Sequence, residues 1–181
     1  MEYQGETGNV SFDFKGRSVV ITGAARGVGR AMVKAFYESG ASIVAADRDE
    51  AGLLETCKPF TERVAAVVAD ISTAEGAASI IGEAVSRYGR LDVCVNNAAV
   101  APHTSLLNER AEVWDMVYSV NCRGTFLMTQ AAARAMIEGG RSGRIINFSS
   151  GASRRGSPGG AAYASSRASL ISARTIVTEP R

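Results

Sequence analysis

Residues 22–29 read TGAARGVG, and this stretch decides the fold class. It follows RSVVIT at residues 17–22, a β-branched run that is typical of a buried strand. It leads into GVGRAMVKAFYESG at residues 27–40, where apolar residues recur at helical spacing. A glycine-rich turn between a strand and a helix lets backbone amides approach a pyrophosphate, and the helix N-terminus adds partial positive charge. The alternative is a glycine-rich turn that holds no ligand.

The rest of the chain alternates expected strands with expected helices. Apolar runs predict further strands at 41–47, 64–70, 91–98 and 144–150. Amphipathic segments predict further helices at 49–57, 73–89, 109–140 and 161–179. This alternation predicts an α/β fold with a doubly wound parallel sheet in the strand order 3-2-1-4-5. Residues 1–13 are expected to form a flexible arm before one domain at 14–181.

Composition narrows the class of function. The 181 residues are 46% hydrophobic and 21% charged, with a net charge of +2, and no concentrated basic face predicts nucleic-acid binding. No stretch has the length of a membrane span, and the N-terminus lacks the pattern of a signal peptide. The spacing of Cys57, Cys94 and Cys122 matches no metal site. We therefore expect a cytoplasmic protein without a metal, with Cys94 buried in the fourth strand.

Acidic residues end the second and third expected strands. Asp47 lies about twenty residues beyond the glycines, where a carboxylate accepts from an adenosine ribose and repels a 2′-phosphate, which favours NAD over NADP. Arg26 and Arg48 argue the other way, because either one could pair with that phosphate instead of remaining solvated. Asp70 can accept from an adenine amino group with Ile71 packed nearby, or it can cap the next helix.

Five motifs occur in order: TGAARGVG, Asp47, NNAA at 96–99, SVN at 119–121, and SS at 149–150 followed by YASSR at 163–167. With them the chain resembles the short-chain dehydrogenase/reductase family from about Arg17 to about Glu179, and its polyol and secondary-alcohol dehydrogenases in particular. The resemblance implies an NAD(P)-binding Rossmann domain, hydride transfer between nicotinamide and a small alcohol or ketone, and a homo-oligomer. The implied cofactor-binding residues are Gly23, Arg26, Gly27, Val28, Gly29, Asp47, Arg48, Asp70, Ile71, Asn97, Ala98 and Ala99.

The resemblance also implies the catalytic residues. Tyr163 would be the general acid/base, Ser150 would orient the substrate oxygen thirteen positions earlier, and Asn121 would hold a relay water. A free tyrosine titrates near pH ~10, so a nearby cation is needed for work near neutrality. Arg167 is four residues beyond Tyr163 on the same expected helix face. The plainer reading of this pair is a surface tyrosine with a flanking cation.

Two departures from the family pattern leave two hypotheses open. Arg167 stands where the family has lysine, and a guanidinium cannot give up its proton. The chain also stops where family members continue with further strands, a Pro-Gly loop and a substrate lid. One hypothesis is a truncated oxidoreductase sequence with reduced chemistry. The other is a nucleotide-binding remnant that binds a partner with little turnover. A smaller departure is Ala99, where the family has glycine.

Overall fold

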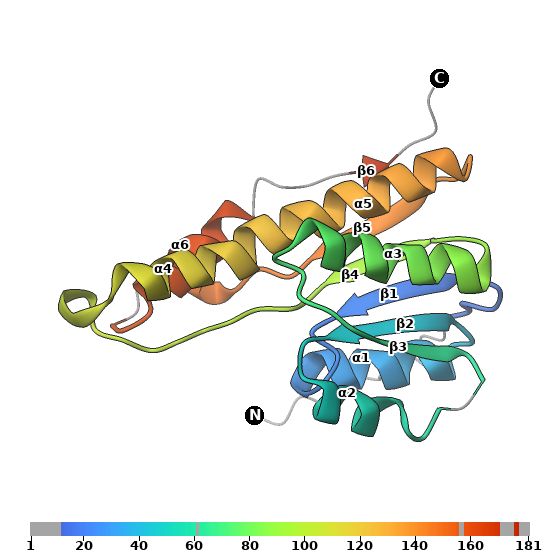
Figure 1. The fold of residues 1–181 in the computed structure, drawn as a ribbon, viewed down its shortest axis with the longest axis horizontal. Coiled ribbons are helices and arrows are strands. Elements are labelled where there is room, and N and C mark those ends of the chain that lie inside the picture. The colour runs from blue at the N-terminus through green and yellow to red at the C-terminus, as the bar shows by residue number, and fades with distance from the viewer. Residues whose placement is uncertain (1–11, 61, 156–157, 171–175, 178–181) are drawn as a thin grey trace, which may run out of the picture.

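The structure, a computed structural model, describes residues 12–60, 62–155, 158–170 and 176–177. Within these residues the chain forms one six-stranded sheet in the order β3-β2-β1-β4-β5-β6 (Figure 1). The strands are β1 (Ser18–Thr22), β2 (Ser42–Asp47), β3 (Val64–Val68), β4 (Val93–Asn96), β5 (Gly143–Asn147) and β6 (Ile176–Val177). The first five strands pair in parallel, which confirms the predicted α/β class and the 3-2-1-4-5 order.

Six α-helices connect and flank the strands within the described residues. They are α1 (Gly27–Glu38), α2 (Glu50–Cys57), α3 (Ala74–Tyr88), α4 (Ala111–Tyr118), α5 (Thr125–Glu138) and α6 (Ala161–Ser169). Short 3₁₀ turns form η1 (Leu106–Asn108) and η3 (Gly151–Ser153), and a π-helical segment, η2 (Ser119–Gly124), joins α4 to α5. Side chains cap α2 and α3, where Asp49 and Thr73 each accept from a backbone N–H three residues later. None of these helices is long and apolar enough to cross a membrane.

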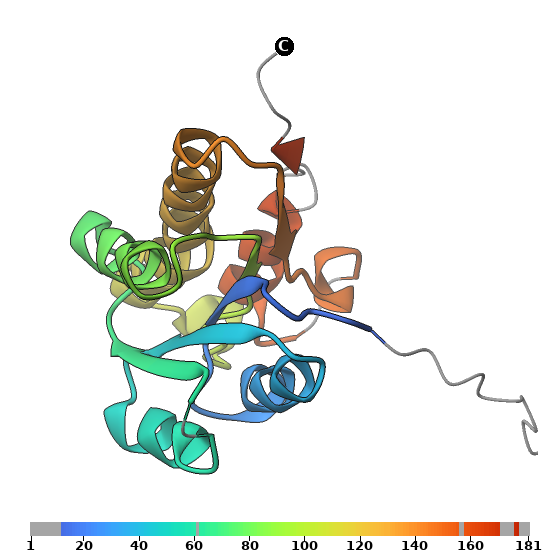
Figure 2. The ribbon, with the colours of Figure 1, turned by 90° about the vertical axis from the view of Figure 1, so that its right-hand side faces the viewer.

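The central strands β1, β2 and β4 are buried on both faces. Val20 of β1 packs among residues of α3 and α5, whereas Val19 and Ile21 pack on the other face against α1 and α2. Figure 2 shows α3 and α5 on one side of the sheet and α1 on the other. Because both faces are covered, the strands are nearly continuously apolar, as is typical of parallel sheets.

The carboxyl ends of the parallel strands meet at one edge of the sheet. The turn after β1, the ends of β2 and β3, and the segment after β4 all lie there. Beyond this edge α4 and α6 lie side by side, at the left in Figure 1. The fold therefore brings every predicted site segment to the same end of the sheet, which is where α/β proteins of this kind bind ligands.

Two of the predicted helices differ from the structure. The expected helix at 109–140 is α4, η2 and α5, with a π turn at Ser119–Gly124 in its middle. The expected helix at 161–179 was wrong at Ile176–Val177, which form β6 antiparallel to Gly143 and Arg144, and residues 171–175 and 178–179 of that prediction lie outside the described residues. The physical reasons are that Ile176 and Val177 are β-branched and that β5 offers an unpaired edge. Residues 1–11 of the expected arm lie outside the described residues.

Asp92 joins the amino ends of β1 and β4. Its carboxylate, 5% exposed, accepts from Arg17, from Arg90 and from the backbone N–H of Ser18. Burial by itself raises the pKa of Asp92, but the hydrogen bonds from Arg90, Ser18 and Arg17 outweigh it and hold the pKa below its ordinary value. This charge cluster lies at the end of the strands opposite the predicted site.

Candidate active site

A cleft of about 350 Å³ opens at the carboxyl ends of β1 to β4. The predicted cofactor residues that line it are Gly23, Arg26, Asp47, Arg48, Asp70, Ile71, Asn97, Ala98 and Ala99. Gly27, Val28 and Gly29 lie outside its lining, on the turn into α1 and its first residues. The structure therefore has a cavity at the crevice where the sequence predicts a binding site.

The first and last glycines of the turn are required by close packing. Gly23 has a φ of +68°, and a Cβ there would lie 2.8 Å from the Cα of Ala98. A Cβ on Gly29 would lie 1.9 Å from the carbonyl oxygen of Gly23. Gly27 differs, because its φ is +56° but a Cβ there would meet no atom within 4 Å. Gly27 therefore supplies a left-handed turn with open space beside it, where a ligand can approach the backbone.

Asn97 ties the end of β4 to the glycine-rich turn. Its side-chain amide donates to the carbonyls of Thr22 and Gly23, at 3.0 and 3.2 Å. Its backbone N–H donates to the Thr22 hydroxyl at 3.1 Å. The neighbouring Asn96 is buried and donates to Thr129 and Asn147. The Asn97 amide thus holds the cradle in shape.

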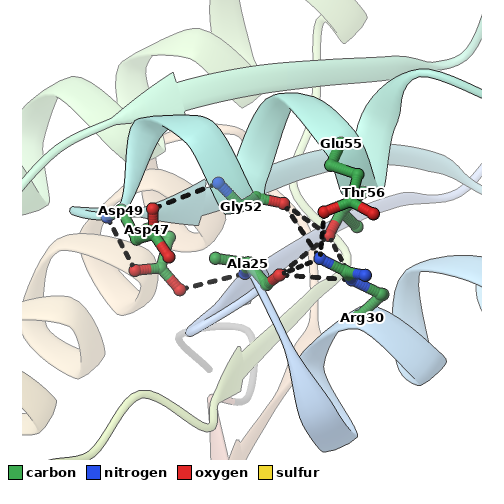
Figure 3. Close-up of polar contacts among 7 residues, drawn as sticks. All are labelled: Ala25, Arg30, Asp47, Asp49, Gly52, Glu55 and Thr56. Carbon is green, nitrogen blue, oxygen red and sulfur yellow. Dashed lines mark hydrogen bonds and ion pairs between the residues drawn. The ribbon is translucent and has the colours of Figure 1, made fainter.

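Asp47 contacts the same turn from the end of β2. One carboxylate oxygen accepts from the N–H of Ala25 at 3.0 Å, and the other accepts from the N–H of Asp49 at 3.0 Å (Figure 3). Each oxygen still has acceptor capacity, because an ionised carboxylate accepts at about four positions. Asp47 is therefore both a support for the turn and an acceptor at the cleft.

Arg30 is a residue of this site that the sequence reasoning missed. From the first turn of α1 its guanidinium donates to the carbonyl of Ala25 at 2.7 Å and to the hydroxyl of Thr56 at 2.9 Å (Figure 3). Its position directly after Gly29 was the available signal, since a long side chain there can reach back to the turn.

Asn121 is fully buried in the π segment η2. Its side chain accepts from the N–H of Val100 at 2.9 Å and donates to the carbonyl of Val100 at 3.0 Å. It also donates to the hydroxyl of Ser166 on α6 at 3.0 Å. Asn121 therefore joins the segment after β4 to the helix that carries Tyr163.

Tyr163 and Arg167 lie one turn apart on α6. The guanidinium carbon of Arg167 is 5.4 Å from the ring centroid of Tyr163, within the range of a cation–π contact. Arg167 is 3% exposed, and one of its nitrogens donates to the carbonyl of Phe148 at 2.9 Å. Its Nε is buried without a hydrogen-bond partner among the described residues. Arg167 is therefore buried inside the protein, whereas Tyr163 is half-buried.

Ser150 lies at the start of the turn η3, after β5. Its hydroxyl oxygen accepts from the N–H of Ala152 at 3.2 Å, so its own hydrogen remains available to a second acceptor. The preceding Ser149 donates to the backbone carbonyl of Arg167 at 2.9 Å and ties the strand end to α6. The cleft lining contains none of Asn121, Ser150, Tyr163 and Arg167 among the residues that the structure describes.

The cysteines are not placed for catalysis at this site. Cys94 is fully buried in β4, as expected, and burial raises the pKa of its thiol to about 12. Burial also raises the pKa of Cys57. Across the described ranges, no group of three or more His, Cys, Asp or Glu side chains could hold a metal ion.

A doubly wound parallel sheet with a glycine cradle at its switch point defines the class of Rossmann-type nucleotide-binding proteins. The family model for short chain dehydrogenases matches residues 17–176. The chain therefore belongs to the short chain dehydrogenase family.

Curated relatives support the same assignment. The chain is 36% identical over 157 residues to a protein named sorbitol dehydrogenase from Cereibacter sphaeroides, covering 87% of this chain and 61% of that protein. It is 38% identical over 158 residues to L-xylulose reductase from Bos taurus, covering 86% of this chain and 62% of that protein. The chain thus spans less than two thirds of the length of these relatives.

A solved structure shows the same fold. A short chain dehydrogenase/reductase from Burkholderia phymatum, in complex with NAD, matches with a TM-score of 0.85 at 28% identity. The match covers 90% of this chain and 59% of that one.

Proposed function

We propose that this protein is an NAD-dependent oxidoreductase that interconverts a secondary alcohol, of the polyol type, and its ketone. The observation that carries the proposal is the contact between Tyr163 and the buried cation of Arg167, in a chain that also has a cleft of about 350 Å³ beside the glycine-rich turn. The names of the two curated relatives, a sorbitol dehydrogenase and an L-xylulose reductase, support a polyol-like substrate.

The cleft fits a dinucleotide. Gly23 and Gly29 leave no room for side chains, and Gly27 exposes backbone beside open space, as a pyrophosphate requires. Asp47 would accept from the adenosine ribose, with Asp70 and Ile71 at the adenine end and Ala98 and Ala99 along the strand edge. The bound cofactor would supply the nicotinamide that accepts or returns hydride.

The carboxylate of Asp47 favours NAD over NADP, because it would repel a 2′-phosphate. Arg26 and Arg48 line the same cleft and are the residues that an NADP-dependent relative of this site would use. Titration of the protein with NADH and NADPH separates the two cofactors. Tighter binding of NADPH would overturn this part of the proposal.

Tyr163 would move the proton of the substrate hydroxyl. Arg167 would place positive charge beside the ring of Tyr163, but a guanidinium does not pass a proton on, so the relay would run through water. Ser150 would donate its free hydroxyl hydrogen to the substrate oxygen. Asn121 would anchor the relay water. Its side-chain hydrogen bonds with Val100 and Ser166 hold the residue in place for this role.

The test is cofactor reduction by the 181-residue protein with sorbitol, xylitol and galactitol as substrates. We expect alcohol-dependent NADH formation that Tyr163→Phe lowers by at least about 100-fold, the usual size of a general acid/base contribution. Equal rates in the wild type and Tyr163→Phe would overturn the role of Tyr163. No heat in calorimetry at millimolar NADH would overturn nucleotide binding itself.

A second candidate function is nucleotide binding with little turnover. The observation that favours it is the state of Arg167, whose guanidinium is buried and donates to the Phe148 carbonyl where the family has a lysine. The same assays distinguish the two candidates, because a binding protein would give NADH-dependent heat without alcohol-dependent NADH formation.

A further inference from the structure

The peptide of Ala25 is held from two sides. Its N–H donates to the carboxylate of Asp47 at 3.0 Å. Its carbonyl accepts from the Nη2 of Arg30 at 2.7 Å. The Nε of Arg30 and the hydroxyl of Thr56 also lie 3.2 Å from this carbonyl, and each shares its single hydrogen with a second acceptor at 2.9 Å. Figure 3 shows Ala25 between Asp47 on one side and Arg30 and Thr56 on the other. The Ala25 peptide is therefore hydrogen-bonded at both its N–H and its carbonyl, which restricts its orientation.

The contacts of Arg30 extend from the turn to α2. Its Nε donates to Thr56 at 2.9 Å and its Nη2 donates to the carbonyl of Gly52 at 3.3 Å. Thr56 is buried and also donates to Gly52 at 2.9 Å. The ion pair with Glu55 is long, at 3.4 Å, and Glu55 is exposed, so it contributes little. The main contacts of Arg30 are therefore its hydrogen bonds to the Ala25 carbonyl and to α2, and not the surface ion pair with Glu55.

The orientation of this carbonyl determines the direction of the next amide. In a trans peptide the carbonyl of one residue and the N–H of the next point in opposite directions. Because the Ala25 carbonyl points toward Arg30 and Thr56, the N–H of Arg26 points away from them. Arg26 lines the cleft, directly before Gly27 with its left-handed φ.

We propose that Arg30 is a positioning residue for the adenosine phosphates of the cofactor. It would act through the Ala25 peptide, which it holds so that the turn at residues 23–27 presents its backbone donors to the cleft. This inference rests on the proposed function, in that the ligand is an adenosine dinucleotide. It adds that α2, which does not bind the phosphates, is part of the binding apparatus.

The binding test compares Arg30→Met, Arg30→Lys and Thr56→Val with the wild type, using ADP and NADH in calorimetry. We expect Arg30→Met to raise the Kd of both ligands by about tenfold, the equivalent of one hydrogen bond in free energy. Arg30→Lys should recover part of the affinity, because an ammonium can still donate to the Ala25 carbonyl but lacks the fork. Thr56→Val should raise both Kd values less than Arg30→Met does. If Arg30→Met does not fold, Thr56→Val still tests the proposal, and unchanged Kd values in it would then contradict the role of the network.

Arg63→Met is the matched control. Arg63 is also half-buried and also donates to two backbone carbonyls, those of Tyr37 and Ala41, far from the cleft lining. A merely structural role for Arg30 would give the two arginine variants the same Kd values. That result, or a wild-type Kd in Arg30→Met, would overturn the proposal.

Amide hydrogen exchange of the peptide that contains residues 23–29 tests the positioning without any ligand. We expect Arg30→Met to increase exchange in this turn at least about tenfold and Arg63→Met to leave it unchanged. If the wild-type protein binds neither ADP nor NADH, the proposed function fails, and this measurement alone decides whether Arg30 orders the turn. Unchanged exchange in Arg30→Met would then refute the positioning role.

Discussion

The guanidinium of Arg167 lies against the ring of Tyr163, with 5.4 Å between the guanidinium carbon and the ring centroid. The cation is buried and donates a hydrogen bond to the carbonyl of Phe148. Tyr163 therefore has beside its ring a guanidinium, a group that stays protonated in proteins. In the proposed reaction Arg167 would supply positive charge beside Tyr163, and its guanidinium would not carry the proton.

Substitution of Arg167 tests whether this residue supplies charge but no path for the proton. Arg167→Lys should raise alcohol-dependent NADH formation by about 10- to 100-fold, because a lysine can release its proton and a misplacement near 1 Å costs about 100-fold. Arg167→Met should lower it below the wild type, because both the charge and the donor to Phe148 are lost. The initial rate at saturating NAD is the measurement. A rate in Arg167→Lys no higher than wild type would count against a relay defect.

Gly29→Ala should abolish ADP binding and lower the free energy of unfolding by about 3 kcal/mol, the cost of forcing an overpacked contact. The added Cβ would lie 1.9 Å from the carbonyl of Gly23, so the turn must move. Gly82→Ala in α3 is the control, since a Cβ there meets no atom within 4 Å. We expect Gly82→Ala to keep wild-type binding and to gain up to about 1 kcal/mol from helix propensity. Urea unfolding and calorimetry measure both quantities.

Asp92 should make the fold sensitive to acid. Its pKa is held below the ordinary value in the folded protein, so its contribution is complete above about pH 4 and is lost as the pH falls through the folded pKa. Asp92→Asn should lower the free energy of unfolding at pH 7 by about 3 kcal/mol, because Arg90 and Arg17 lose their partner.

Urea unfolding between pH 7 and pH 3 separates this effect from general acid lability. The difference between the wild type and Asp92→Asn should shrink as the pH falls. Asp115→Asn on the exposed side of α4 should stay within about 0.5 kcal/mol of the wild type. A constant difference across the pH range would contradict the linkage.

Cys94 should be the slowest thiol of the folded protein. A pKa of about 12 leaves about one part in ten thousand as thiolate at pH 8, and the side chain is fully buried. With iodoacetamide and peptide mass spectrometry, Cys57 and Cys122 should be labelled first, since both are half-buried. Labelling of native Cys94 at the rate of Cys122 would contradict the buried environment, and in urea all three should react alike.

Much of the fold was predictable because its signals are local. The β-branched runs, the glycine turn and Asp47 each carry their meaning within a few residues, and parallel alternation restricts the strand order. The cleft followed from the same logic, since strand ends meet at one edge. The prediction that Ile176 and Val177 continue a helix was wrong because their pairing partner, β5, lies more than thirty residues earlier in the chain.

The missed parts of the site depend on contacts across the fold. The position of Arg30 after Gly29 indicates that it can reach the turn, but nothing near it in the sequence shows that Thr56 of α2 will also contact its guanidinium. The burial of Arg167 depends on where the Phe148 carbonyl lies, which periodicity does not report. The roles of Tyr163, Ser150 and Asn121 stay predictions until the variants are assayed.

The π turn at Ser119–Gly124 changes the direction in which the side chains of the following helix point. Each π turn holds one residue more than an α turn, which rotates the following helix by about 100° relative to an uninterrupted one. The segment before the turn packs against α6, and the segment after it packs against α3 and the sheet. The continuous helix formed by α4, η2 and α5 thereby packs against α6 with its first part and against α3 and the sheet with its last part. Asn121 lies in this π turn. A one-residue deletion here would rotate α5 relative to α4, so that the side chains of one of these helices would no longer meet the elements they pack against.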